Sequence, residues 1–150
     1  LKRAAKAAGE FAYMFDALSD LCRVLELKYD LGVITRAAYL GHKKKELTAI
    51  TDEVYPELIK RLKKFIASFK ELWNKDNKPF GLELHEMRLG GLLLRLECCR
   101  EVLKDYLAGK IDKIEELEAP VIKFVPEREK TANLCVQSHI ATVTVASMNF

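Results

Sequence analysis

Two arginines and a pair of glycines on one predicted helix are the residues whose types and spacing best suit a binding role. Arg88, Gly91 and Arg95 follow the spacing i, i+3 and i+7, and Gly90 precedes Gly91. Residues at these spacings share one face of an α-helix. Each interior glycine costs about 1 kcal/mol relative to alanine, and glycine is favoured where another backbone must come close. We therefore predict a domain interface formed by Arg88, Gly90, Gly91 and Arg95.

The arginines indicate what such an interface would recognise. Guanidinium groups form forked hydrogen bonds with carboxylates, which suits them to clamp acidic or carbonyl groups of a partner. The alternative is that a helix of the same domain packs against the glycines, with each arginine paired to a nearby acid such as Glu86. The sequence leaves both interpretations open.

No metal or cofactor site is predicted. The three histidines, His42, His85 and His139, are scattered, and His85 lacks the second histidine of an H-E-x-x-H motif. Without that pair, one helix face cannot present two imidazoles to a zinc ion. Neither of the common glycine-rich phosphate-binding patterns is present.

No catalytic residue is predicted either. Asp52 and Glu53 are adjacent carboxylates, and acid–base chemistry would need burial to separate their pKa values. They stand just before Pro56, and acidic residues are favoured at the start of a helix. We therefore expect this pair to cap a helix.

Charge and hydropathy argue against nucleic-acid and membrane partners. The net charge of the 150 residues is only +3, from 25 basic and 22 acidic residues. The lysine-rich runs at residues 42–45 and 60–64 are therefore expected to be solvated helix faces rather than anion sites. No apolar stretch approaches the roughly 20 residues that span a bilayer.

The elements that must position these residues are helices. Apolar residues recur at steps of three and four along residues 2–28, 56–73 and 81–107, the pattern of amphipathic helices. A short helix capped by Thr35 and a break or restart between Thr51 and Pro56 are expected between them. The first helix carries a stripe that we expect to be buried, formed by Phe11, Phe15, Leu18, Cys22, Leu25 and Tyr29.

Two apolar stripes on the helix over residues 81–107 predict that it lies at the centre of the fold. One contains Leu89, Leu92, Leu96, Cys99, Leu103 and Tyr106, and the other contains Met87, Leu94, Cys98 and Val102. Burial of both would sandwich this helix between the helices over 2–28 and 56–73. The predicted fold is mainly α, a helical bundle with a long central helix.

The tail differs from the rest of the chain. Residues 121–125 and 140–146 are rich in β-branched residues, which predicts short β-strands near the C-terminus. We expect residues 1–150 to form a single helical domain. Because the chain opens with Leu1 inside a helical pattern, we expect it to be a C-terminal fragment of a larger multidomain protein.

The cysteines bear on the compartment. Cys22, Cys98, Cys99 and Cys135 show no C-x-x-C spacing, and the first three fall in apolar helical patterns. Such cysteines are typical of buried, reduced thiols. We therefore expect a cytoplasmic protein.

Several stretches resemble a known family. These are NKPFGLELHEMRLGGLLLRL at residues 77–96, YLAGKIDKIEELE at 106–118, GVITRAAY at 32–39 and ATVTV at 141–145. They are similar to the helical C-terminal domain of bacterial β-N-acetylhexosaminidases of glycoside hydrolase family 20, of the exo-β-N-acetylglucosaminidase type.

The resemblance implies a parent glycosidase that removes terminal N-acetylhexosamine from glycans, with the substrate's acetamido oxygen as nucleophile. In the family, an Asp that orients this group and a neighbouring acid–base Glu follow a His-x-Gly-Gly element. Nothing similar precedes Asp52 and Glu53, so these roles are not transferred. A catalytic barrel of about 250 residues does not fit in this chain, and we expect the chain alone to be inactive.

The implied partners are the catalytic barrel of the same chain, a second subunit of a homodimer, and the N-acetylhexosamine-terminated glycans bound by the parent enzyme. The domain would support the barrel, shape the rim of the sugar pocket or form the dimer contact. The alternative is a stand-alone helical protein-interaction or scaffold module, unrelated to carbohydrate hydrolysis. A His-x-Gly-Gly-Asp-Glu element in the upstream coding sequence would distinguish the two.

Overall fold

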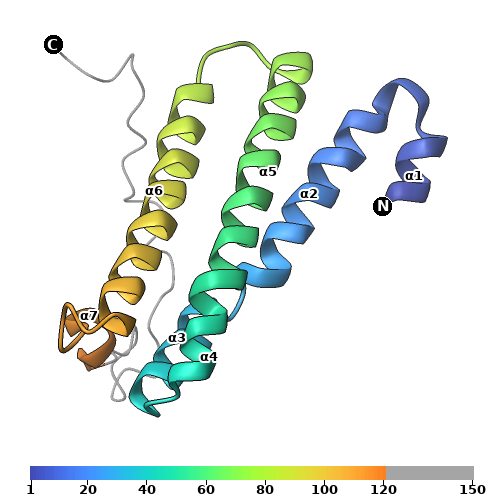
Figure 1. Ribbon diagram of the computed structural model, residues 1–150. Helices are drawn as coiled ribbons and strands as arrows, with labels where there is room; N and C mark the ends of the chain where they lie inside the picture. Colours follow the sequence, from blue (N-terminus) through green and yellow to red (C-terminus); the bar gives the residue numbers. More distant parts are fainter. Residues whose placement is uncertain (121–150) are drawn as a thin grey trace, which may run out of the picture.

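The computed structural model describes residues 1–120, and helices make up most of this part (Figure 1). In chain order they are α1 (Lys2–Ala7), a 3₁₀ turn (Gly9–Phe11), α2 (Ala12–Lys28), α3 (Leu31–Leu40), α4 (Lys44–Ala49), a π-helical turn (Ile50–Val54), α5 (Tyr55–Asp76), α6 (Leu82–Leu107) and α7 (Glu115–Glu118). The prediction of a mainly helical fold is confirmed. The strands predicted at 121–125 and 140–146 lie outside the described residues.

Helix α5, rather than α6, is the middle helix of the fold. Figure 1 shows α2, α5 and α6 side by side, with α5 between the other two. The prediction that the helix over 81–107 is sandwiched is therefore wrong. The reason is the width of the apolar face of α5, which buries Leu58, Leu62 and Phe65 and has Ile59 and Ile66 packed beside them. This face contacts a neighbour on each side.

The N-terminal helix departs from the prediction in two ways. It is interrupted at Gly9, whose φ of 56° is a left-handed conformation that glycine adopts readily, and α1 folds back beside the start of α2 (Figure 1). The stripe expected to be buried is mostly exposed, with Tyr29 89% exposed. α2 instead packs on α5 through Ala17, Asp20 and Val24, because the small Ala17 permits close approach and the Asp20 carboxylate accepts a 2.5 Å hydrogen bond from Lys64.

Between Thr51 and Pro56, where a break or restart was predicted, the regular α-helix is interrupted by a wider turn but the chain stays helical. The chain passes from α4 to α5 through the π-helical turn Ile50–Val54. Proline cannot donate to the carbonyl four residues earlier, and a wider turn accommodates such a loss without ending the helix. Asp52 and Glu53 lie exposed on this turn and form no capping hydrogen bond, so the expected capping role is wrong.

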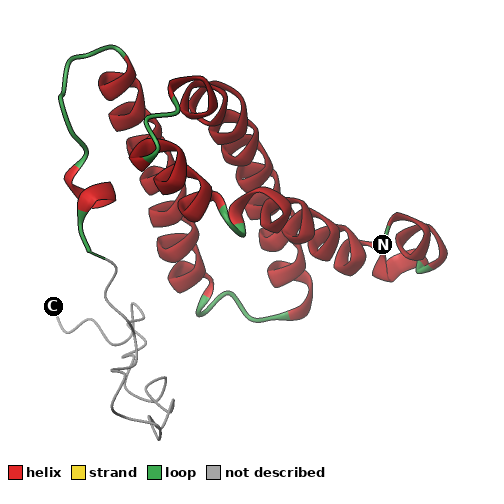
Figure 2. Ribbon diagram, turned by 90° about the horizontal axis from the view of Figure 1, so that it is seen from below, coloured by secondary structure: helices red, strands yellow, loops and turns green. Residues whose placement is uncertain are grey.

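The segment after α6 is fastened to α3. Arg36 donates from Nε to the Leu117 carbonyl and from Nη2 to the Ala119 carbonyl, each at 2.9 Å. The Tyr39 hydroxyl accepts a 2.9 Å bond from the Ile114 amide and donates to Glu118 at 2.7 Å. Figure 2 shows α7 as the short helix before the grey trace, reached by a long loop. These bonds place residues 114–119 over one end of α6.

We predict that two leucines on α6 differ sharply in their contribution to stability. Leu96 is 4% exposed, which confirms its predicted burial, whereas Leu94 is 62% exposed. Leu96→Ala should lower the free energy of unfolding by about 2–5 kcal/mol because it leaves a cavity. Leu94→Ala should change it by less than about 0.5 kcal/mol. Urea unfolding followed by circular dichroism measures both, and equal losses would contradict the observed register of α6.

Candidate functional site

The predicted interface residues Arg88, Gly90, Gly91 and Arg95 are all exposed on α6. A methyl group added at Gly90 or Gly91 would meet no heavy atom within 4 Å, apart from those of its chain neighbours and its own helix backbone, in the part of the chain that the structure describes. No described helix therefore packs against the glycine pair. The open glycines leave room for another backbone to approach, and the interface role stays a prediction.

The two arginines have different surroundings. Arg95 donates to Glu116, and this hydrogen bond raises the pKa of the guanidinium. Arg88 forms no hydrogen bond or ion pair within residues 1–120. The acid suggested as a local partner, Glu86, instead pairs with Lys70 on α5 at 2.7 Å. Of the two arginines on this face, Arg88 is the one whose guanidinium forms no ion pair within the described residues. It is therefore available to a partner.

An apolar stripe runs along α6 beside these residues. It consists of the second predicted stripe, Met87, Leu94, Cys98 and Val102, together with Gly91. We expected this stripe to be buried, and that prediction is wrong, because Met87 is 55% exposed and Val102 41%. The opposite side of α6, with Leu96 and Leu103, occupies the contact with α5. α6 therefore has an uncovered apolar face in the described part of the chain.

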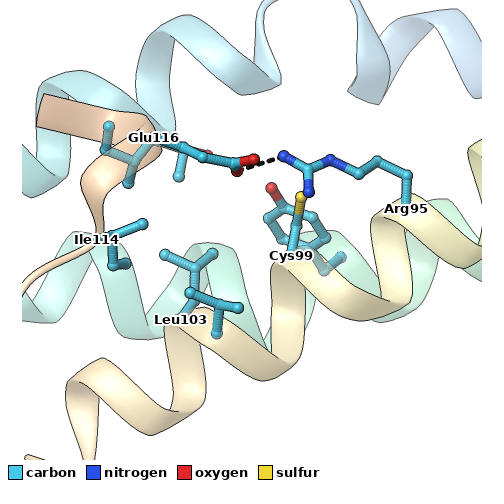
Figure 3. A pocket seen from close by; sticks show the side chains of 9 residues that line it. Arg95, Cys99, Leu103, Ile114 and Glu116 are labelled. Atoms are coloured by element: carbon cyan, nitrogen blue, oxygen red, sulfur yellow. Dashed lines mark hydrogen bonds and ion pairs between the residues drawn. The ribbon is translucent and has the colours of Figure 1, made fainter. Parts of the chain in front are cut away.

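A small cavity of about 60 Å³ lies where α3, α5, α6 and residues 114–117 meet. Figure 3 shows Cys99 and Leu103 reaching it from α6, Ile114 reaching it from the segment before α7, and Arg95 meeting Glu116 across its edge. Its polar lining includes the hydroxyls of Thr35 and Tyr55. The ion pair between Arg95 and Glu116 therefore borders a cavity whose interior is mostly apolar.

Burial determines the chemistry of the cavity. It raises the pKa of the Tyr55 hydroxyl and of the Cys99 thiol, and a thiol that stays protonated is a poor nucleophile. Thr35 is 3% exposed, and its hydroxyl lies close enough to that of Tyr55 to lower the tyrosine's pKa against the effect of burial, although the geometry falls short of a hydrogen bond among the described residues. The cavity has room for water that could satisfy this hydroxyl. Its lining contains no paired carboxylates of the kind that glycoside hydrolysis uses.

The sequence did not indicate this cavity. Thr35 was expected to cap a helix, but it lies inside α3, with Leu31 and Ala38 buried beside it on the same face. The sequence offered one indication of it, a threonine at a position where the helical periodicity places apolar residues. Cys99 was predicted to be buried and is half-buried, whereas Cys22 and Cys98 are exposed, contrary to expectation. These three cysteines form no disulfide within the described residues.

Within residues 1–120, every cation of the basic run at 60–64 has an acidic partner. Its cations pair with acids on three helices: Lys60 and Arg61 with Glu57, Arg61 also with Glu26, Lys63 with Glu97, and Lys64 with Asp20. The pairs with Glu26 and Asp20 join α5 to α2, and the pair with Glu97 joins it to α6. The run therefore helps to hold the helices together, which the spacing within a single helix could not reveal.

The other residues considered as metal ligands do not form a site in the described part of the chain. His85 packs against the rings of Phe69 and Trp73, with centroid distances of 5.1 and 4.9 Å. Within residues 1–120, no three His, Cys, Asp or Glu side chains gather closely enough to hold a metal ion. No helix of this part is both long and apolar enough to cross a membrane.

The comparisons with known proteins give one family. Residues 1–136 match the family described as the Glycoside Hydrolase 20C C-terminal domain. The match therefore includes α1 to α7 and the whole α6 face. No curated protein matches the chain.

We predict that Thr35→Val stabilises the chain. Valine has nearly the shape of threonine but no hydroxyl, so the substitution removes a buried polar group whose contact with the Tyr55 hydroxyl falls short of a hydrogen bond. The free energy of unfolding should rise by about 1 kcal/mol, as measured by urea unfolding. Thr35→Ser keeps the hydroxyl and loses a methyl group, so it should be destabilising. A loss of stability in Thr35→Val would mean that the hydroxyl is hydrogen-bonded in solution.

Proposed function

Because the chain belongs to the family of glycoside hydrolase 20C C-terminal domains, we propose that it is the non-catalytic C-terminal helical domain of a bacterial β-N-acetylhexosaminidase. That enzyme would remove terminal N-acetylhexosamine from glycans. The family membership agrees with the resemblance carried by residues 77–96 and 106–118. In this proposal residues 1–150 are one domain of a multidomain chain, and their partner is the catalytic barrel of that chain.

We propose that α6 docks on the barrel and supports it. The observation that carries this role is the uncovered α6 face, where the exposed Met87 and Leu94 flank the open Gly91. Burying apolar surface contributes about 25 cal/mol per Å², and a glycine lets a neighbouring backbone approach closely. Arg88, at the edge of the stripe, would donate to a carboxylate or carbonyl of the barrel.

The residues present indicate which domain of the enzyme would supply the catalytic groups. The small cavity beside Thr35 and Cys99 contains a single carboxylate, that of Glu116, and Asp52 and Glu53 lie exposed on the π-helical turn. The barrel would supply the catalytic carboxylates and bind the glycan. Cys22, Cys98 and Cys99 form no disulfide with one another, which favours a reducing compartment and supports the proposal of a cytoplasmic enzyme.

Gly91→Leu tests the docking face. In the 150-residue chain this substitution should leave the melting temperature unchanged or slightly raised, because the site is open and leucine is the better helix former. In the intact enzyme it should lower the melting temperature, because the side chain holds the barrel away from α6. Differential scanning calorimetry measures both.

The matched control is Ala67→Leu, which adds a similar side chain at an exposed position of α5. It should leave both melting temperatures unchanged. A fall in the melting temperature of the 150-residue chain with Gly91→Leu would place the glycine inside a packed contact of the domain. An unchanged intact enzyme would exclude this face as the docking surface.

Activity provides a separate test of the assignment. The purified 150-residue chain should release no chromophore from a chromogenic N-acetylglucosaminide, whereas the intact enzyme should hydrolyse it. Turnover by the chain alone that disappears with Asp52→Asn or Glu53→Gln would show that this pair is catalytic. An intact enzyme that is inactive on both N-acetylglucosaminides and N-acetylgalactosaminides would refute the proposed substrate class.

A further inference from the structure

The exposed side of α3 carries an apolar hollow whose lining, among residues 1–120, comes from α3 alone. The lining consists of Gly32, Val33, Arg36, Ala37 and Leu40. Val33 is 72% exposed and Leu40 is 49% exposed, whereas the opposite side of α3 is buried in the core. Arg36 is the one charged residue of this lining, so an apolar occupant fits the hollow and would gain free energy by leaving water.

The chain that ends the described part of the molecule is held at the edge of this hollow. Arg36 donates to the Leu117 and Ala119 carbonyls, each at 2.9 Å, and Tyr39 donates to Glu118 at 2.7 Å. Within the described residues, these bonds from α3 are the ones that tie this short stretch to another helix. The uncovered faces of α2 and α6 form no such bond with it. The chain therefore leaves the described structure beside α3.

The backbone at this point is extended. Ala119 has a φ of −53° and a ψ of 138°, the conformation that a following proline such as Pro120 imposes. At the extended rise per residue, residues 121–125 would span about 16 Å. The hollow runs along α3 from Gly32 to Leu40, about 12 Å at the rise of an α-helix. The five residues that follow Pro120 are therefore long enough to cross it.

The composition of these five residues suits the hollow. Residues 121–125 read VIKFV, four apolar side chains and one lysine. In an extended chain alternate residues share a side, so Ile122 and Phe124 lie on one side and Lys123 on the other. The family match extends to residue 136, so the segment lies inside the matched region.

We propose that residues 121–125 lie in the α3 hollow, with Ile122 and Phe124 against the helix. The small Gly32 and Ala37 leave room for these two large side chains. The backbone of the segment stays at the surface, where water satisfies the amide and carbonyl groups that a single extended chain leaves unpaired. The occupant of the hollow is then the chain's own continuation, and the barrel does not contact this side of α3.

Thiol labelling of the 150-residue chain tests whether the hollow is covered. Val33→Cys places a thiol in the hollow, and Tyr29→Cys places one outside it, at a position that is 89% exposed. Iodoacetamide should alkylate Val33→Cys at least about tenfold more slowly than Tyr29→Cys, because the covered thiol reacts only when the segment lifts away. Peptide mass spectrometry separates these thiols from the native cysteines. Equal rates would overturn the proposal.

A second pair of variants identifies the segment. Adding Phe124→Asp to Val33→Cys should restore fast alkylation, because a carboxylate is costly to bury in an apolar hollow. The matched control adds Lys123→Asp, on the other side of the segment, and should leave alkylation slow. Circular dichroism should show the same helix content in all these variants.

The remaining outcomes would each overturn the proposal. Slow alkylation that persists with Phe124→Asp would mean that a different part of the chain covers the hollow. Slow alkylation that is lost on dilution would mean that a second copy covers it, and protection found only in the intact enzyme would mean that the barrel does. Because none of these measurements involves α6, their failure would leave the docking of the barrel on α6 intact.

Discussion

The broad apolar face of α5 can be removed from water only if a helix lies on each side of it, and the rest of the fold follows from that constraint. Leu58 and Leu62 are almost fully buried at its centre, and ion pairs from the same helix reach α2 and α6 at its edges. Once α5 holds the middle position, α2 and α6 become edge helices. Within residues 1–120, each covers one apolar stripe against its neighbours and leaves the other exposed.

This arrangement explains which parts of the fold could be predicted from the sequence. Periodicity located the long helices and the buried register of Leu96 and Leu103 on α6, because these depend on residues within one helix. Periodicity could not choose between two apolar stripes on the same helix, since the choice depends on which neighbour arrives. The interruption at Gly9 and the π-helical turn before Pro56 depend in the same way on how the surrounding helices pack.

The candidate sites likewise include features that lie on one helix, which the sequence could indicate, and features that depend on the fold, which it could not. The exposed face of Arg88, Gly90 and Gly91 could be singled out from residue type and spacing on one helix, although its role is still a proposal. The partner of Arg95 could not, because Glu116 lies 21 residues away and is brought close by the fastening of residues 114–119 to α3. The cavity beside this pair draws its lining from four separate parts of the chain, so no local pattern could have revealed the buried Thr35 hydroxyl.

The bonds from Arg36 and Tyr39 also determine how the domain would bear a mechanical load. The two Arg36 bonds hold the backbone at Leu117 and Ala119, just before the last described residue, Pro120. Tension applied to the chain beyond that point would therefore act on α3 before it could unwind the final turn of α6. Since α3 packs directly on α4 and lies in the same buried cluster as α5, the pull would be shared across the core. The C-terminal end of α6 is thus protected from fraying by a helix that precedes it by about 70 residues.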